Sequence, residues 1–299
     1  MQSSSLAVRH PAWVGLRLKN FGNAWKHTGE APLGAEEIDL DLDQLAAKKW
    51  GLVAFDLDDT LAPSKSALPS EMAVALRALL DVCQVAVISG GAQTQFESQL
   101  LDGLEASPQQ LSRLHLLPTC GTRYLQFEDG ELTEVYAHDL SAEDRDQACQ
   151  VLEEVAKTQG IWENKTWGPI LEDRGSQITY SALGQSAPLT EKRTWDPSGE
   201  KKNRLAREVG RRLPHLEVRS GGSTSVDITE RGIDKAYGME RLQEMTGLAR
   251  DSTVFIGDRL DPAGNDYPVR AEGWPTHAVE GWKDTVTAIN RIVEAHTQG

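Results

Sequence analysis

The sequence predicts an α/β protein in which a doubly wound parallel sheet is interrupted by an inserted α+β module. Two observations predict it. Short apolar segments alternate with helix-periodic segments on both sides of the chain's middle, and the middle itself alternates polar and apolar residues as antiparallel strands do. The chain has 299 residues, of which 39% are hydrophobic and 25% charged, so it can bury a normal core.

The first half of the sheet is predicted from two apolar segments, residues 51–56 (GLVAFD) and 84–89 (QVAVIS). Strands of this kind are buried on both faces, as in a parallel sheet covered by helices. Residues 69–80 lie between them and predict a helix, because their apolar residues have helical spacing and a proline stands at the start. Gly90 and Gly91 lead into a second helix.

The second half repeats this order after residue 231. Residues 252–257 (STVFIG) predict a further buried strand, with helices at 235–245 and 282–295 on either side. Strands and helices that alternate with short connections are typical of a doubly wound sheet. The two halves are therefore expected to form one sheet.

The module between the halves is expected at about residues 139–231. A hairpin over 124–136, turning at Asp129-Gly130, precedes it. The segments that predict the module are a helix at 141–159, strands near 177–181 and 217–219, and a charged helix at 199–212. Residues 1–48 are expected to be an N-terminal extension without chemistry, in which Trp13, Phe21 and Trp25 suit an arm and 38–43 alternate as an edge strand would.

The charge and the cysteine content exclude several classes of protein. The 31 basic and 45 acidic side chains give a net charge of −14 at pH 7, a field that repels phosphate backbones and anionic lipid. We therefore expect no nucleic-acid and no membrane partner. Three separated cysteines without a CxxC pair disfavour a disulfide framework or a zinc site. Without an apolar run of ~20 residues or a secretory start, a cytoplasmic protein is expected.

Three carboxylates follow the first predicted strand. Asp56, Asp58 and Asp59 fall within four positions, and Thr60 comes next. Ligands collect at the carboxyl ends of strands in open α/β sheets because the loops diverge there. Crowded carboxylates repel one another unless a hard cation shares them, and oxygen ligands suit Mg²⁺. Taken alone, the segment is explained equally well as an acidic turn that caps a helix.

Three further motifs lie at predicted strand or helix ends. Ser89-Gly90-Gly91 offers a hydroxyl and backbone amides where a helix begins, an arrangement that binds phosphate oxygens. Lys235 places an ammonium at a helix start, and Asp258, followed by Asn265 and Asp266, forms a second acidic strand end. Together the four motifs indicate one site for a divalent cation and a phosphoryl group.

This motif set resembles that of the haloacid dehalogenase (HAD) phosphotransferase superfamily, subclass IIB, and within it the eukaryotic-type phosphomannomutases. The segments that carry the closer likeness are GDRLDPAGND at 257–266, SVDITERGIDK at 225–235 and LEDRGSQITYSALG at 171–184. The likeness is collinear from about residue 49 to 299. It implies a HAD-like doubly wound core of residues 49–138 and 232–299, with an α/β cap domain inserted at 139–231.

The resemblance also implies roles. Asp56 would be the nucleophile that takes the phosphoryl group, and Asp58 the general acid and base. Mg²⁺, the implied cofactor, would bind Asp56, the backbone carbonyl of Asp58, and Asp258. The residues expected to hold the phosphoryl oxygens, or to orient Lys235 and the surroundings of the metal, are Ser89, Gly90, Gly91, Lys235, Thr60, Asn265 and Asp266.

Two departures from the family's pattern bear on the substrate. Where relatives have glycine after the acid/base aspartate, this chain has Asp59, which demands a tolerant turn and adds a candidate ligand around the metal. In the cap, Arg174 matches one arginine of the clamp that grips the phosphate remote from the reaction. Gln185 stands at a second clamp position, and Lys192 or Arg193 falls near a third. The grip on a second phosphate is therefore expected to be weak.

The cap keeps a surface that suits a sugar, because Ser225 and Asp227 match positions that contact the sugar in the family. The expected function is a Mg²⁺-dependent phosphatase for a phosphorylated sugar or similar small metabolite, acting through an aspartyl-phosphate. A phosphomannomutase-like isomerase is the alternative. A catalytically silent phosphosugar sensor is disfavoured because Asp56 and Asp58 are both present. A homodimer through the cap is also expected.

Overall fold

The structure is a computed structural model that describes residues 39–297 of the chain. The arm expected around Trp13, Phe21 and Trp25 lies outside the described residues. Helix α1 (Leu42–Ala46) stands where an edge strand was predicted, because Asp41 and Gln44 form a capping box at its start. The edge-strand prediction is therefore wrong for residues 41–43.

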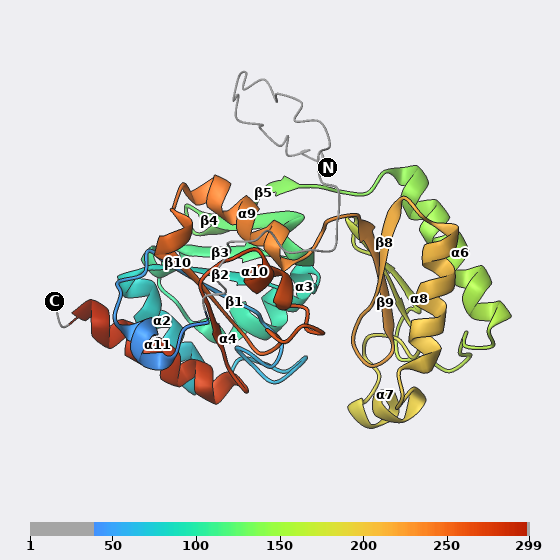
Figure 1. The fold of residues 1–299 in the computed structure, drawn as a ribbon, viewed down its shortest axis with the longest axis horizontal. Helices are drawn as coiled ribbons and strands as arrows, with labels where there is room; N and C mark the ends of the chain where they lie inside the picture. Colours follow the sequence, from blue (N-terminus) through green and yellow to red (C-terminus); the bar gives the residue numbers. More distant parts are fainter. Residues whose placement is uncertain (1–38, 298–299) are drawn as a thin grey trace, which may run out of the picture. The chain divides into compact units, whose positions relative to one another are not determined.

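A seven-stranded sheet forms the core of the fold (Figure 1), in the order β11-β10-β1-β2-β3-β4-β5. The first five strands of this order are parallel, and β4 and β5 form an antiparallel hairpin at the edge. The doubly wound parallel sheet predicted from the sequence is confirmed. Its strands are β1 (Leu52–Phe55), β2 (Gln84–Ile88), β3 (Leu114–Leu117), β4 (Arg123–Glu128), β5 (Glu131–Ala137), β10 (Thr253–Gly257) and β11 (Thr276–Ala278).

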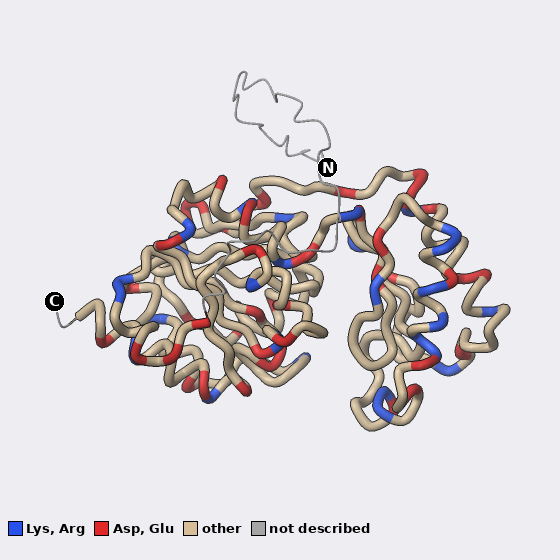
Figure 2. Tube along the Cα trace, in the orientation of Figure 1, with Lys and Arg blue, Asp and Glu red and all other residues tan. Residues whose placement is uncertain are grey.

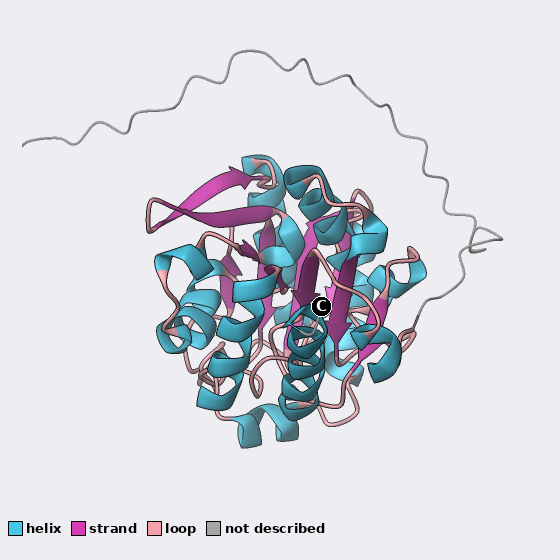
Figure 3. Cartoon of the chain, turned by 90° about the vertical axis from the view of Figure 1, so that its left-hand side faces the viewer, coloured by secondary structure: helices cyan, strands magenta, loops and turns pink. Residues whose placement is uncertain are grey.

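Helices cover both faces of this sheet (Figure 3). Along β1, Val53 and Phe55 join one hydrophobic cluster and Leu52 and Ala54 another, as the alternation of side chains along a strand requires. The Val53 cluster includes residues of α1, α2 (Ser70–Val82), α3 (Gln93–Phe96), the π-helix η1 (Glu97–Leu101), α4 (Asp102–Leu104), α5 (Pro108–Leu111) and α11 (Trp282–Thr297). The Leu52 cluster includes residues of α9 (Lys235–Thr246) and α10 (Tyr267–Ala271). Short 3₁₀ turns precede two strands, η2 (Thr119–Gly121) before β4 and η3 (Arg250–Ser252) before β10.

A second sheet of four strands, which we call the cap sheet, is built from residues between β5 and α9. Its order is β6-β7-β9-β8, and every neighbouring pair is antiparallel. Ile178 and Tyr180 of β7 pack with Val226 and Ile228 of β9 against α6 and α8. The strands of the cap sheet are β6 (Leu171–Asp173), β7 (Gln177–Ser181), β8 (Leu216–Ser220) and β9 (Ser225–Glu230), and the helices of the same segment are α6 (Ala142–Thr158), α7 (Leu189–Trp195) and α8 (Glu200–Arg212).

Acidic and basic residues are distributed along both sheets, and basic residues are concentrated on α8 (Figure 2). This helix carries two lysines and four arginines. Arg211 pairs with Glu208 and Arg212 with Glu154, each at 2.7 Å, so the protein's own acids neutralise part of that charge. Among residues 39–297, no helix has the length and the apolar character needed to cross a membrane.

His115 of β3 is a buried titratable residue of the core. Its side chain is 4% exposed, and its ring nitrogens lie 2.6 Å from the Tyr124 hydroxyl and 2.8 Å from Oε1 of Gln84. Burial lowers the pKa of His115 to about 4. The imidazole is therefore neutral in the folded protein at neutral pH.

We expect His115 to make the free energy of unfolding fall as the pH is lowered from about 6.5 to about 4. In that range the unfolded chain protonates this histidine and the folded chain does not, which removes about 3 kcal/mol of stability. Urea unfolding across this pH range measures the effect. His115→Gln lacks the titrating ring, so its stability should fall less steeply, and parallel pH profiles for the two proteins would contradict the assignment.

Candidate active site

The carboxyl ends of three core strands bring the predicted site residues to one edge of the sheet. Because β1 pairs in parallel with both β2 and β10, Asp56, Ser89 and Asp258 follow their strands at the same edge. Asp56 and Ser89 are 3% and 4% exposed. The backbone N–H of Asp56 donates to the carbonyl of Ile256 on β10 at 3.1 Å, which fixes the start of the loop.

Lys235, the first residue of α9, points into this edge. Its side chain is 1% exposed, and Nζ lies 2.6 Å from Oδ1 of Asp56 and 2.5 Å from Oδ1 of Asp266. The side chain of Asp234 caps the helix. Its Oδ1 accepts from the backbone N–H groups of Ala236 and Tyr237, which have no partner within the helix. The helix start thus carries the ammonium to a fixed place between two carboxylates.

The charges of this cluster shift one another's pKa. Burial, opposed by Lys235 and reinforced by Asp266, raises the pKa of Asp56. Burial works to lower the pKa of Lys235, but Asp266 and Asp56 outweigh it and raise that pKa, so the ammonium stays charged. Burial and the neighbouring Asp266 raise the pKa of Asp258. The cluster holds more negative charge than its single ammonium balances.

The residues of the cluster fit a divalent cation. Carboxylate oxygens of Asp56, Asp258 and Asp266 all lie within 4.8 Å of one another. Thr60 donates its hydroxyl to Asp258 at 3.2 Å and accepts the N–H of Asp258 at 3.1 Å, which orients that carboxylate. Three carboxylates against one ammonium leave an excess of negative charge, and an all-oxygen donor set suits Mg²⁺.

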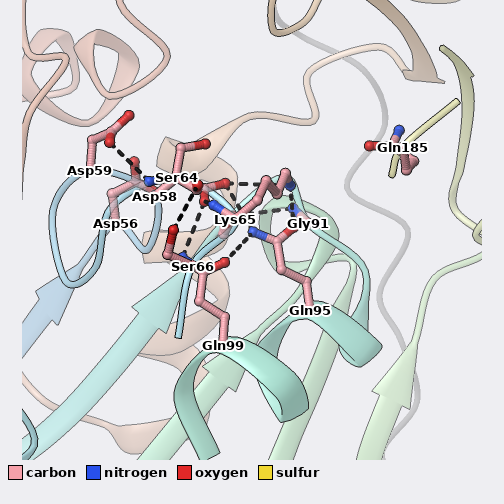
Figure 4. Close-up of polar contacts among 12 residues, drawn as sticks. Asp56, Asp58, Asp59, Ser64, Lys65, Ser66, Gly91, Gln95, Gln99 and Gln185 are labelled. Atoms are coloured by element: carbon pink, nitrogen blue, oxygen red, sulfur yellow. Dashed lines mark hydrogen bonds and ion pairs between the residues drawn. The ribbon is translucent and has the colours of Figure 1, made fainter. Parts of the chain in front are cut away.

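The carboxylate of Asp58 is not part of that cluster, and it contacts side chains that follow β2 (Figure 4). Its Oδ1 accepts from the backbone N–H of Lys65 at 2.9 Å and from Nε2 of Gln99 at 3.2 Å. Its Oδ2 accepts from Nε2 of Gln95 at 2.9 Å, and the Lys65 ammonium lies 3.5 Å away. Burial alone would raise the pKa of Asp58, but the charge of Lys65 and these donors outweigh it and lower that pKa.

The sequence motifs did not indicate Lys65, Gln95 or Gln99 as site residues. The available signal was their placement: the two glutamines lie four residues apart soon after Gly90-Gly91, so they share a helix face close to the strand ends. Asp59 has the left-handed φ of +63° that the tolerant turn demands. Its Oδ1 accepts from the N–H of Ser64 at 3.0 Å, and its carboxylate lies outside the cluster of Asp56, Asp258 and Asp266.

The loop after β2 forms one hydrogen bond within itself and one to the cap sheet. The N–H of Gly91 donates to Oγ of Ser89 at 3.1 Å, and the carbonyl of Gly90 accepts from Nη1 of Arg174 at 3.1 Å. The Ser89 hydroxyl therefore keeps its hydrogen free to donate to a ligand. Asn265 is exposed, whereas Asp266 is buried against Lys235.

The predicted cap residues lie on or beside the cap sheet. Asp227 accepts from Nε2 of Gln177 at 3.0 Å and from the hydroxyl of Thr179 at 2.8 Å. Ser225 pairs with Ser181 across β7 and β9, on the same face as Asp227. These residues form a polar face opposite the face that packs on α6 and α8.

The predicted clamp residues Arg174, Gln185 and Lys192 contact other groups of the protein. Nη2 of Arg174 pairs with Glu172 at 2.7 Å. Lys192 donates its ammonium to the backbone carbonyl of Gln185 at 2.7 Å, and the Gln185 side chain stands apart from the contacts around Asp58 (Figure 4). The arginine is thus already paired with an acid of its own sheet.

Sequence and structure comparisons show which proteins this chain is similar to. Residues 154–295 match the family model described as eukaryotic phosphomannomutase. Phosphomannomutase 1 of Homo sapiens is 25% identical over 258 residues, covering 82% of this chain and 93% of its own length. A solved haloacid dehalogenase-like hydrolase from Bacteroides thetaiotaomicron superposes with a TM-score of 0.56 at 19% identity, covering 84% of this chain and 99% of its own.

The chain is similar in sequence to the eukaryotic phosphomannomutases, as the motifs indicated, and it shares the fold of a haloacid dehalogenase-like hydrolase. The phosphomannomutase of Arabidopsis thaliana is 24% identical over 259 residues, covering 83% of this chain and 99% of its own. The ATP-bound IMP-nucleotidase of Plasmodium falciparum shares the fold, with a TM-score of 0.65 at 15% identity over 86% of this chain and 64% of that one.

We expect Asp258→Asn to weaken Mg²⁺ binding at least about 10-fold. Loss of a group that merely hydrogen-bonds to a metal-ligating side chain already weakens metal binding by about that factor, and Asp258 is expected to bind the ion itself. Titration of the protein with MgCl₂ in a calorimeter measures this without an activity assay. Asp251→Asn is the matched control, since Asp251 is exposed and precedes the same strand. Equal affinities for the two variants would place the ion elsewhere.

Proposed function

We propose that the protein is a Mg²⁺-dependent phosphatase that releases phosphate from a phosphorylated sugar or a similar small metabolite. The observation that carries the proposal is the position of Lys235. Its ammonium lies between Asp56 and Asp266, at the strand edge that also holds Asp258 and Ser89. A nucleophilic carboxylate, a cation and a metal-binding carboxylate at one buried edge suit phosphoryl transfer.

The proposed reaction has two steps. In the reacting form Asp58 is protonated and Asp56 is ionised. A carboxylate oxygen of Asp56 attacks phosphorus, the bond from phosphorus to the substrate oxygen breaks, and Asp58 gives its proton to that oxygen. Asp58 then takes a proton from a water molecule that attacks the acyl phosphate, which releases inorganic phosphate and restores Asp56. The Ser89 hydroxyl and the Lys235 ammonium would bind the phosphoryl oxygens throughout.

The residues that would hold Mg²⁺ are Asp56 and Asp258, through their carboxylates, and Asp58, through its carbonyl. When bound, the ion neutralises charge on the phosphoryl group. On the cap sheet, the polar face around Ser225 and Asp227 offers hydroxyl and carboxylate groups that suit the hydroxyls of a sugar.

The cap favours water over a sugar hydroxyl as the acceptor. A mutase must grip the phosphate that is not reacting, and arginine forks serve this purpose best. Arg174 is already paired with Glu172, whose charge repels a second dianion, and Gln185 carries no charge. The cap therefore supports sugar recognition better than recognition of a second phosphate.

A phosphomannomutase-like isomerase is the second candidate, and two observations favour it. The relatives named above are phosphomannomutases. In addition, burial and then the charge of Lys65 lower the pKa of Lys192, so the two ammonium groups repel each other and an anion between them would relieve that repulsion. This pair could replace part of the missing arginine grip.

One mixture separates the two functions. The protein, Mg²⁺ and a hexose bisphosphate activator are supplied with mannose 1-phosphate or mannose 6-phosphate, and free phosphate and isomer conversion are followed together. We expect phosphate release that exceeds isomer conversion, because the cap holds the second phosphate weakly. Conversion without matching phosphate release would establish the mutase instead.

Asp56→Asn should reduce either activity at least about 10³-fold, because the amide cannot form the acyl phosphate. The matched control is Asp59→Asn, since asparagine tolerates the left-handed turn and keeps the oxygen that accepts from Ser64. Steady-state rates of both variants against the wild type test the nucleophile. Residual activity of Asp56→Asn equal to that of the control would show that Asp56 is misassigned.

A further inference from the structure

We propose that Gln95 and Gln99 are positioning residues that orient the carboxylate of Asp58 for proton transfer. This inference rests on the proposed function, because it takes Asp58 as the general acid and base. Gln95 donates to Oδ2 at 2.9 Å and Gln99 donates to Oδ1 at 3.2 Å. A neutral donor at each oxygen fixes both the direction and the plane of the carboxylate without adding charge.

The two amides are themselves held in one orientation. Nε2 of Gln95 also donates to Oε1 of Gln99 at 3.0 Å, and Oε1 of Gln95 accepts from the Lys65 ammonium at 2.5 Å. Each amide oxygen is therefore occupied by a donor, and each amide nitrogen is directed at Asp58. Gln99 is 3% exposed, so water does not compete for its bond.

The backbone is shaped for this contact. A Cβ added to Gly91 would lie 2.2 Å from Oε1 of Gln95, so glycine lets the amide fold back over the loop after β2. The helix that follows widens into the π-helix η1, which contains Gln99. Such π-turns displace side chains from ordinary helical positions and recur at functional sites. Together these features bring both amides to the same carboxylate.

A general acid must present its proton within hydrogen-bond reach of the leaving oxygen, and small misplacements cost large factors in rate. Asp58 stands on a loop, between Asp56 and the left-handed Asp59. Without the glutamines, only Lys65 would hold its carboxylate. We therefore expect their loss to impair the steps in which Asp58 moves a proton and to spare substrate binding.

The test is a series of aryl phosphates whose leaving groups range from phenol to 2,4-dinitrophenol. Gln95→Ala and Gln99→Ala should each lower kcat/KM about 10-fold for phenyl phosphate and leave it unchanged for 2,4-dinitrophenyl phosphate, whose leaving oxygen needs no proton. Gln93→Ala is the matched control on the same helix, because Gln93 donates to Glu97 and not to Asp58. Equal losses across the series would overturn the inference.

Gly91→Ala supplies a second variant. The φ of Gly91 lies outside the left-handed region, so alanine meets Gln95 and not a backbone barrier. Gly91→Ala should reproduce the loss for phenyl phosphate and should add nothing in the Gln95→Ala background. If the two losses multiply, Gly91 acts independently of Gln95 and the proposed coupling is wrong.

A structural measurement separates this inference from the proposed function. If the wild type transfers no phosphoryl group from any ester, the proposed function fails. A crystal structure of the Gln95→Ala, Gln99→Ala variant then decides the positioning role. A carboxylate of Asp58 that leaves its place beside Lys65 supports the role, and an unchanged carboxylate overturns it.

Discussion

The fold at the site depends on one buried ammonium, that of Lys235. A charge removed from water in this way is very costly unless opposite charges contact it directly. Asp56 and Asp266 supply that contact from the end of β1 and from the start of α10. The Lys235 ammonium therefore ties together three segments that are distant in the sequence, and the buried carboxylates cannot separate without exposing an unpaired charge.

This constraint explains features of the surrounding backbone. A Cβ on Gly257 would lie 2.4 Å from Oδ2 of Asp266, so the glycine at the end of β10 lets that carboxylate approach the sheet. The same oxygen accepts the N–H of Arg259 at 3.0 Å, which folds the loop after β10 back on itself. The acidic excess that remains around Asp258 is then a consequence of the architecture, and it favours a divalent cation at that edge.

The sequence predicted the strands of the candidate site correctly where a hydrophobic pattern ends directly in a polar residue. Apolar segments that end in Asp56, Ser89 and Gly257 predicted both the buried strands and the edge at which their polar ends meet. The contacts of Asp58 were not predictable, since Gln95 and Gln99 reach it across 37 and 41 residues and depend on a π-helix with no local signal. An edge strand was expected where a capping box starts α1, because alternation and capping compete within the same few residues.

The choice between water and a sugar hydroxyl lies outside this edge of the sheet. Both acceptors would attack the same acyl phosphate on Asp56 and lose their proton to the same Asp58, so neither residue discriminates between them. For a sugar hydroxyl to be the acceptor, the phosphorylated sugar must stay bound while it reorients to present that hydroxyl. The cap is the part of the protein that we expect to supply this binding. Because Glu172 occupies one arm of Arg174, a second phosphate would have to displace a carboxylate to be gripped, and its binding energy is reduced by that exchange. Water meets no such requirement, and the pairing of Arg174 with Glu172 is therefore the reason that we propose water as the acceptor.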